Sequence, residues 1–113
     1  MILEIKHYTD DQGNKLASIP LVNSPKRVEM YEEDLKGLID RGIPLMWKLS
    51  LGRAFIIGKR GKGTTVARYV VDAGNNEKVR FVDGNGLNMR RENLHVTTFK
   101  EMRRDHVVTH VFE

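Results

Sequence analysis

The chain has 113 residues, of which 40% are hydrophobic and 30% are charged. This length and composition predict one globular domain rather than two domains or a disordered chain. The absence of cysteine excludes a disulfide framework, a thiolate zinc site and a cysteine nucleophile. No apolar run reaches the roughly 18 residues of a membrane helix, and the acidic Glu4 follows Met1 too closely for a secretory signal. We therefore expect a soluble intracellular protein.

Positive charge is concentrated in the second half of the chain. Residues 1–50 hold seven Lys and Arg against eight Asp and Glu, whereas residues 51–113 hold twelve against seven, and the formal net charge is +4. Residues 53–68 contain no acidic residue, and their positively charged residues are Arg53, Lys59, Arg60, Lys62 and Arg68. A basic half of this kind is typical of proteins that bind a polyanion such as nucleic acid.

The first forty residues predict a β-hairpin and then a helix. Strand-like runs at residues 2–6 and 16–21 flank a cluster of turn formers at residues 10–14. Asn23-Ser24-Pro25 predicts a break in the chain. A helix is expected over residues 29–40, because one face would carry the apolar side chains of Tyr31, Leu35, Leu38 and Ile39.

The rest of the chain predicts short strands and one more helix. Residues 45–51 and 54–58 are expected to pair around a turn, and the β-branched run at residues 64–71 favours a third strand. Strands at residues 79–82 and 95–97 would flank the turn cluster Asp83-Gly84-Asn85-Gly86. A capping box at Thr98 and Glu101 predicts a helix over residues 99–106, and a closing strand is expected within residues 107–112. The predicted fold is α+β, a single domain over residues 1–113.

Residues 79–98 carry a resemblance to a known family. Asp83-Gly84-Asn85, then Arg90-Arg91-Glu92-Asn93-Leu94, then Val96, resemble the core of the HNH homing-type endonucleases, which belong to the His-Me finger or ββα-metal nucleases. Upstream, Ile19-Pro20-Leu21, Glu32-Glu33-Asp34-Leu35 and Trp47 are similar to the N-terminal part of phage and bacterial members. The resemblance covers about residues 19–106. It implies a small antiparallel sheet with an N-terminal hairpin and helix, followed by a ββα finger at about residues 78–106. It also implies a phage-encoded protein in the cytoplasm of a bacterial host.

The catalytic positions that the resemblance implies hold other residues in this chain. The family carries an Asp-His pair on the first finger strand, as metal ligand and general base, and here the pair falls on Arg80-Phe81. A guanidinium has no acceptor for a cation, and a phenyl ring cannot take a proton. The helical metal ligand falls on Met102, a soft thioether poorly matched to Mg²⁺. Asn93, which ties the loop in the family, is retained. The resemblance therefore implies a catalytically inactive HNH-like protein with no metal and no cofactor.

The expected function is sequence-tolerant binding of double-stranded DNA through phosphate contacts. The residues expected to make these contacts are Arg53, Lys59, Arg60, Lys62, Arg80, Arg90, Arg91, Arg103 and Arg104. One alternative is a phage inhibitor that uses the same scaffold to bind a host protein. Another is an active metal-dependent endonuclease with a displaced base, either His95 or His106 with Asp105. The sequence leaves the oligomeric state open.

Several of these features also have a purely structural interpretation. Residues 59–63 form either a solvated hairpin tip or a tip that grips phosphates, and Arg91 with Glu92 can simply tie the loop. Trp47 and Tyr69 are expected in the core rather than as stacking platforms. An apolar plug in place of the metal would consist of Phe81, Leu94 and Met102.

Overall fold

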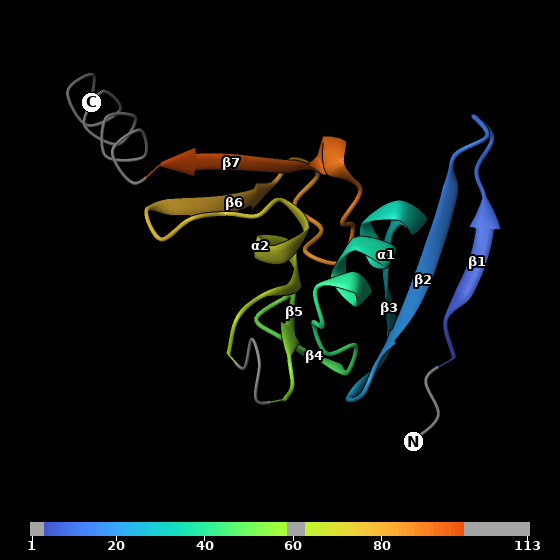
Figure 1. Ribbon diagram of the computed structural model, residues 1–113, viewed down its shortest axis with the longest axis horizontal. Helices are drawn as coiled ribbons and strands as arrows, with labels where there is room; N and C mark the ends of the chain where they lie inside the picture. The colour runs from blue at the N-terminus through green and yellow to red at the C-terminus, as the bar shows by residue number, and fades with distance from the viewer. Residues whose placement is uncertain (1–3, 59–62, 99–113) are drawn as a thin grey trace.

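The computed structural model describes residues 4–58 and 63–98, and over these ranges the chain has an α+β fold (Figure 1). Antiparallel pairing builds one three-stranded sheet, β1-β2-β3, and two hairpins, β4-β5 and β6-β7. The α+β class is thus as expected. The predicted helix over residues 99–106 and the predicted strand within residues 107–112 lie outside the described residues.

The N-terminal hairpin forms as the turn residues predict, although its first strand lies at residues 6–9 and not at residues 2–6. β1 (Lys6–Thr9) pairs with β2 (Lys15–Leu21), so that Thr9 lies opposite Lys15. The Asp10 carboxylate closes the turn by accepting the backbone N–H groups of Gln12 at 2.9 Å and Asn14 at 2.8 Å. These bonds stabilise the ionised carboxylate, and the bond from Asn14 contributes most to lowering the pKa of Asp10.

Residues 24–31 form a strand, β3 (Ser24–Tyr31), where the sequence predicts a break and the start of a helix. Val28 and Met30 are fully buried and alternate with the half-exposed Arg27 and Glu29, which is strand periodicity. A bulge between Pro20 and Leu21 shifts the register where β2 meets β3. The prediction of a helix from residue 29 was wrong because this third strand completes the sheet.

The helix α1 (Glu32–Asp40) begins three residues later than predicted. Leu35 and Leu38 are buried, whereas Ile39 is exposed and Tyr31 precedes the first turn. Gly42, with φ of 71°, ends the helix in a Schellman arrangement: its N–H donates to Ile39, and the N–H of Ile43 donates to Leu38.

In residues 47–70 the structure confirms a predicted hairpin and replaces a predicted strand by a helix. β4 (Trp47–Ser50) and β5 (Arg53–Ile56) pair as predicted, and Trp47 is fully buried in the core. Residues 66–70, predicted as strand, form the short helix α2 (Val66–Val70). Val66, Ala67 and Val70 are buried on one helical face, which packs against α1, β5 and β6. Packing has overruled the β propensity of the two valines.

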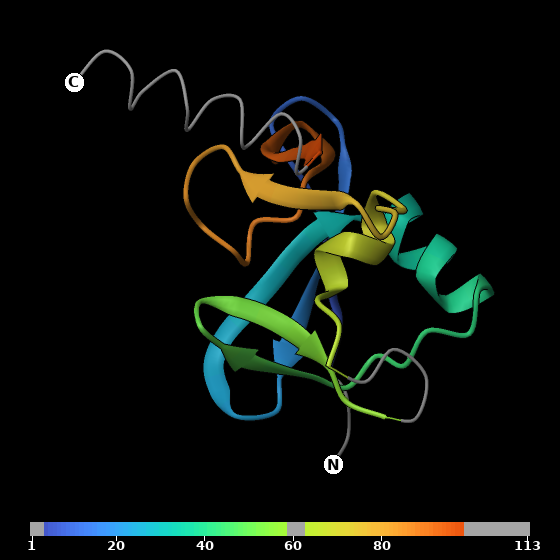
Figure 2. The same ribbon diagram turned by 90° about the vertical axis from the view of Figure 1, so that its left-hand side faces the viewer.

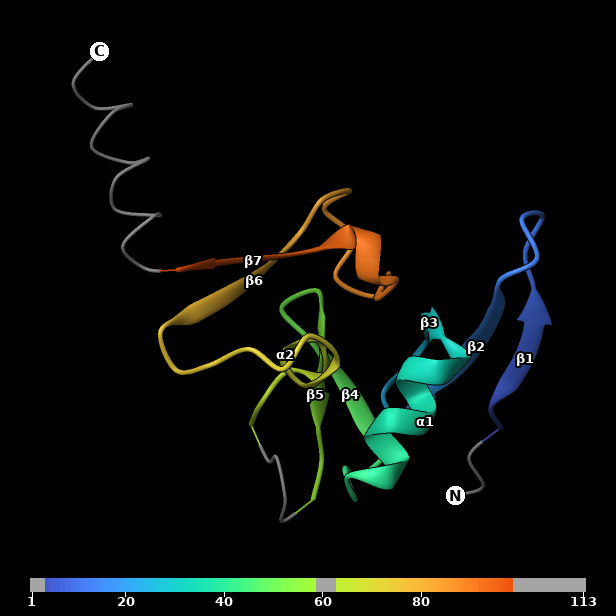
Figure 3. The ribbon, with the colours of Figure 1, turned by 45° about the horizontal axis from the view of Figure 1, so that its top comes forward.

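The last hairpin forms on either side of a long loop. β6 (Glu77–Phe81) pairs with β7 (Leu94–Thr98), which follows the 3-10 turn η1 (Arg91–Asn93). Figures 1 and 3 show this hairpin apart from the β1-β2-β3 sheet, with α1, α2 and the β4-β5 hairpin between them. Figure 2 shows α2 between β6 and the β4-β5 hairpin.

The loop between β6 and η1 returns to the N-terminal sheet. The backbone of Glu29 on β3 accepts from Met89 at 2.8 Å and donates to Leu87 at 3.0 Å. Leu87 and Met89 thereby enter the same core as Trp47 and Met30. Neither helix in the described ranges has the length and apolarity needed to cross a membrane.

Candidate nucleic-acid interface

Three cations from different parts of the chain line one surface hollow, which we name the basic hollow. Arg53 comes from β5, whereas Lys78 and Arg80 come from β6. The basic hollow has a volume of about 530 Å³. Its lining contains no acidic residue and consists of Leu51, Gly52, Arg53, Lys78, Arg80, Phe81, Gly84 and Gly86. Such a surface attracts anions.

A close backbone contact holds the two walls of the basic hollow together. A Cβ atom on Gly86 would lie 2.1 Å from the carbonyl oxygen of Gly52 and 3.2 Å from the Cγ of Arg53. Only glycine at position 86 therefore lets the loop after β6 approach the β4-β5 turn this closely. This close contact places the end of the β4-β5 hairpin that carries Arg53 beside the loop that follows β6.

Phe81 supports the guanidinium of Arg53. The Cζ atom of Arg53 lies 5.9 Å from the centroid of the Phe81 ring, within cation–π range. Phe81 is half-buried and packs on the core, while Arg80, the preceding residue on β6, is exposed. Because side chains alternate along β6, Phe81 packs on the core while Arg80 faces the solvent.

The remaining arginines of the described ranges are engaged within the fold. Arg27 donates to Ser18, Arg41 to Tyr69, and Arg68 to the carbonyls of Gly74 and Glu77. These guanidinium groups hold turns and strand ends together. In the part of the chain that the structure describes, Arg53 and Arg80 are the arginines whose side chains make neither a hydrogen bond nor an ion pair with another residue.

Arg90 and Arg91, both predicted to contact DNA, lie in these internal networks. Arg90 lies with its Nη1 atom 3.5 Å from Glu29 Oε2, and it also donates to the Asn88 side chain at 3.3 Å. Arg91 pairs with the buried carboxylate of Asp34, with 2.8 Å between Nε and Oδ1. About half of the Arg91 side chain is exposed. The structure therefore does not bring these two arginines to the basic hollow.

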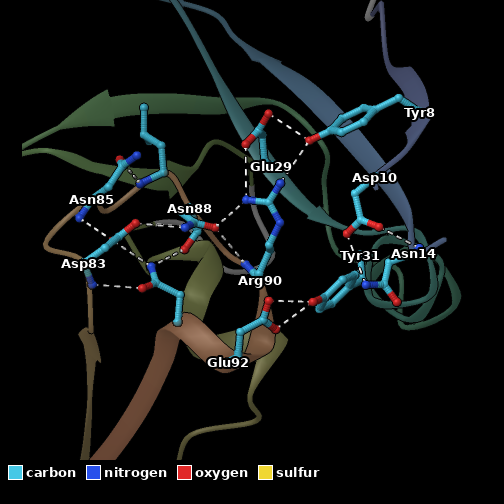
Figure 4. Close-up of polar contacts among 12 residues, drawn as sticks. Tyr8, Asp10, Asn14, Glu29, Tyr31, Asp83, Asn85, Asn88, Arg90 and Glu92 are labelled. Atoms are coloured by element: carbon cyan, nitrogen blue, oxygen red, sulfur yellow. Dashed lines mark hydrogen bonds and ion pairs between the residues drawn. The ribbon is translucent and has the colours of Figure 1, made fainter. Parts of the chain in front are cut away.

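Asn93 is buried and ties the loop that follows β6, whose residues Asp83, Asn85 and Asn88 are labelled in Figure 4. Its side-chain oxygen accepts the backbone N–H of Asp83 at 2.9 Å, and its amide donates to Asp83 Oδ1 and to the Asn88 carbonyl, both at 2.9 Å. Asp83 also accepts from the Asn88 side chain and the Asn85 backbone. These bonds, led by the one from Asn88, lower the pKa of the Asp83 carboxyl.

A second polar network joins the loop to the N-terminal sheet (Figure 4). The Tyr31 hydroxyl donates to both oxygens of Glu92, at 2.5 and 2.7 Å. This hydrogen bond raises the pKa of Tyr31 to about 12. The Tyr8 hydroxyl donates to Glu29 at 2.8 Å, and burial together with this bond raises the pKa of Tyr8. The Tyr31–Glu92 bond thus fixes the end of the loop against β3, and the Tyr8–Glu29 bond ties β1 to β3.

The structure offers no ready metal site within the described ranges. No group of three or more His, Asp or Glu side chains there is arranged to hold a metal ion. His95 lies opposite Arg80 in the β6-β7 register, and both are exposed. Several predicted site residues lie outside the described residues: Lys59, Arg60, Lys62, Met102, Arg103, Arg104, Asp105 and His106.

Lys78 is the cation of the basic hollow that sequence reasoning missed. It is two residues before Arg80 on β6, so strand alternation places both on the same side. That spacing was the available signal.

A second hollow, of about 730 Å³, lies between the β1-β2 turn and α1, but its charges are mixed: Lys15 and Lys36 stand beside Glu32 and Glu33.

No protein-family model, no curated protein and no solved structure matches this chain.

Proposed function

We propose that this chain is a catalytically inactive HNH-like protein that binds double-stranded DNA through phosphate contacts. One observation carries the proposal. Arg53 and Arg80, the arginines of the described ranges whose side chains make no hydrogen bond or ion pair, line the same hollow, with Lys78 beside them. Free guanidinium groups in a surface hollow match phosphate oxygens, which they bind through several N–H donors.

The order of elements supports the family part of the proposal. β6, a loop tied by a buried asparagine, and β7 follow one another as the first parts of an HNH finger do. Asn93 makes the loop-tying bonds that the resemblance assigns to it. The helix that would complete the finger falls on residues 99–106, outside the described residues.

The side chains at the catalytic positions do not fit a divalent metal or a general base. Arg80 and Phe81 occupy the positions of the metal-ligating Asp and the basic His. Arg80 offers only N–H donors, and Phe81 packs on the core beneath Arg53. A fixed positive charge at this place repels a metal cation and attracts the phosphate that the metal would have contacted.

Binding of this kind has a characteristic dependence on salt. Each phosphate neutralised by a lysine or arginine releases counterions, so the logarithm of the binding constant falls with the logarithm of salt with a slope of about −0.9 per contact. Phosphate contacts carry no base information, so the binding is sequence-tolerant.

The test is a titration of labelled duplex and supercoiled plasmid with purified protein, with and without Mg²⁺ or Mn²⁺, over a range of salt. We expect a salt-sensitive complex and no cleavage. Arg53→Ala, Lys78→Ala and Arg80→Ala should each weaken binding about 3- to 10-fold and make the salt slope less steep by about 1.

Lys36→Ala is the matched control, because it removes the same charge from the other hollow on α1. It should change affinity and slope far less than Lys78→Ala. Metal-dependent nicking would instead favour an endonuclease with a displaced base. An absence of binding to duplex DNA at near-physiological salt would contradict the proposal and favour the host-protein inhibitor.

A further inference from the structure

The tip of the β4-β5 hairpin holds a leucine in a backbone conformation that disfavours its side chain. The register pairs Ser50 with Arg53, which leaves Leu51 and Gly52 as a two-residue turn with φ of 52° and 75°. Positive φ at both central positions is the type I′ pattern, in which Asn-Gly is strongly preferred. A leucine in the left-handed region is strained because its Cβ crowds the following carbonyl.

Burial does not offset this strain. Leu51 is 91% exposed, more than any other large hydrophobic residue in the described ranges. Residues in strained backbone conformations cluster at binding and catalytic sites. An asparagine at this position would relieve the strain and suit the solvent.

The surroundings of Leu51 are cationic on two sides. With Arg53, Lys78 and Arg80 it lines the basic hollow, and it also lines a smaller hollow of about 370 Å³ that includes Lys48. One projecting apolar side chain therefore stands between positively charged groups.

We propose that Leu51 is an apolar wedge that enters the minor groove of duplex DNA and partly unstacks a base step. This inference rests on the proposed function and specifies how the duplex is held. An apolar side chain between bases, with cations against the phosphates on either side, is the arrangement by which minor-groove proteins kink DNA. The smaller hollow also contains the apolar side chains of Phe55, Ile56 and Ile57. The three cations that line the basic hollow with Leu51 favour an anionic partner such as DNA over a protein.

The test uses a duplex with a central TA step that carries a 2-aminopurine, a base whose fluorescence rises when it unstacks. Pyrimidine–purine steps deform most easily, so they favour a wedge. The wild-type protein should raise this fluorescence at saturation and bind the TA duplex about 3- to 10-fold more tightly than an A-tract duplex. Leu51→Asn should lose most of the fluorescence rise and most of this preference.

Leu51→Asn separates the wedge from folding, because it creates the favoured Asn-Gly turn. Its thermal unfolding midpoint should equal or exceed that of the wild type. Ile39→Gln is the matched control, since it makes an exposed apolar residue of α1 polar at the other hollow. This control should behave as the wild type does in both DNA measurements.

The failures of the two proposals give different results. A wild-type protein that binds both duplexes equally, without a fluorescence change, would overturn the wedge and leave phosphate binding intact. An equal fluorescence rise with Leu51→Asn and the wild type would do the same. No binding to any duplex would overturn both proposals, and Leu51-dependent binding to anionic vesicles alone would identify a membrane surface instead.

Discussion

The guanidinium of Arg53 lies over the ring of Phe81, 5.9 Å from its centroid, and this contact joins the β4-β5 hairpin to β6. Phe81 stands where the family resembled by this sequence carries its general base. In this chain the side chain at that position supports a cation. In the function that we propose, this cation holds a phosphate without cutting the DNA.

Replacement of the Phe81 ring should weaken DNA binding without unfolding the protein. In Phe81→Leu the side chain still packs on the core, but Arg53 loses a cation–π contact of about 0.5–1 kcal/mol. We expect duplex affinity to fall about 2- to 5-fold, as measured by fluorescence anisotropy. Tyr69→Leu, at another partly buried aromatic residue that packs on the core, is the control. An equal loss in both variants would show that Phe81 has no specific role.

Two glycine-to-alanine substitutions should have opposite effects on stability. At Gly86 the new Cβ would collide with the carbonyl of Gly52, so the loop and the hairpin must move apart. At Gly37, within α1, the Cβ meets nothing within 4 Å. Gly86→Ala should destabilise the fold by about 1–3 kcal/mol, whereas Gly37→Ala should stabilise it by about 0.5–1 kcal/mol. Urea unfolding measures both, and a neutral Gly86→Ala would contradict the close contact.

The loop after β6 should depend on Asn93 for its order. Asn93→Ala removes three hydrogen bonds and leaves the Asp83 N–H and the Asn88 carbonyl without their partner. We expect a loss of about 2–4 kcal/mol in the free energy of unfolding. Amide hydrogen exchange at Asp83 should accelerate at the same time. Asn76→Ala, in the exposed turn before β6, should leave both measurements near the wild-type values.

The Tyr31–Glu92 hydrogen bond should make stability depend on alkaline pH. The pKa of Tyr31 is raised from 10.0 to about 12 in the folded state, so the folded protein keeps a proton that the unfolded chain loses. The resulting stabilisation is fully present below pH 10 and is lost as the pH rises from 10 to about 12.

Tyr31→Phe should remove this part of the pH dependence. Chemical unfolding at several alkaline pH values measures the effect, and the ultraviolet absorbance of tyrosinate follows the titration itself. Tyr69→Phe is the control, since the Tyr69 hydroxyl makes no hydrogen bond with another residue of the described ranges. Equal alkaline slopes for the wild type and Tyr31→Phe would contradict the prediction.

The sequence alone determined the features that depend on local chemistry. The turn formers at residues 10–14, Gly52 in the β4-β5 turn and residues 83–86 place three reversals of the chain, because glycine, asparagine and aspartate favour turns wherever they occur. The α+β class and the buried Trp47 follow from the same kind of pattern. The loop-tying position of Asn93 was available from the resemblance, and the structure gives its bonds.

The tertiary structure decided the features that depend on neighbours distant in sequence. Residues 24–31 became a strand because β2 offered an unpaired edge, and residues 66–70 became a helix because three surfaces of the core surround them. Charge counting could not separate Arg53 and Arg80 from Arg90 and Arg91. Whether a guanidinium is free for a ligand depends on which carboxylate or carbonyl the fold places within about 3 Å of it. That placement depends on tertiary packing, so it cannot be predicted from any single stretch of the sequence.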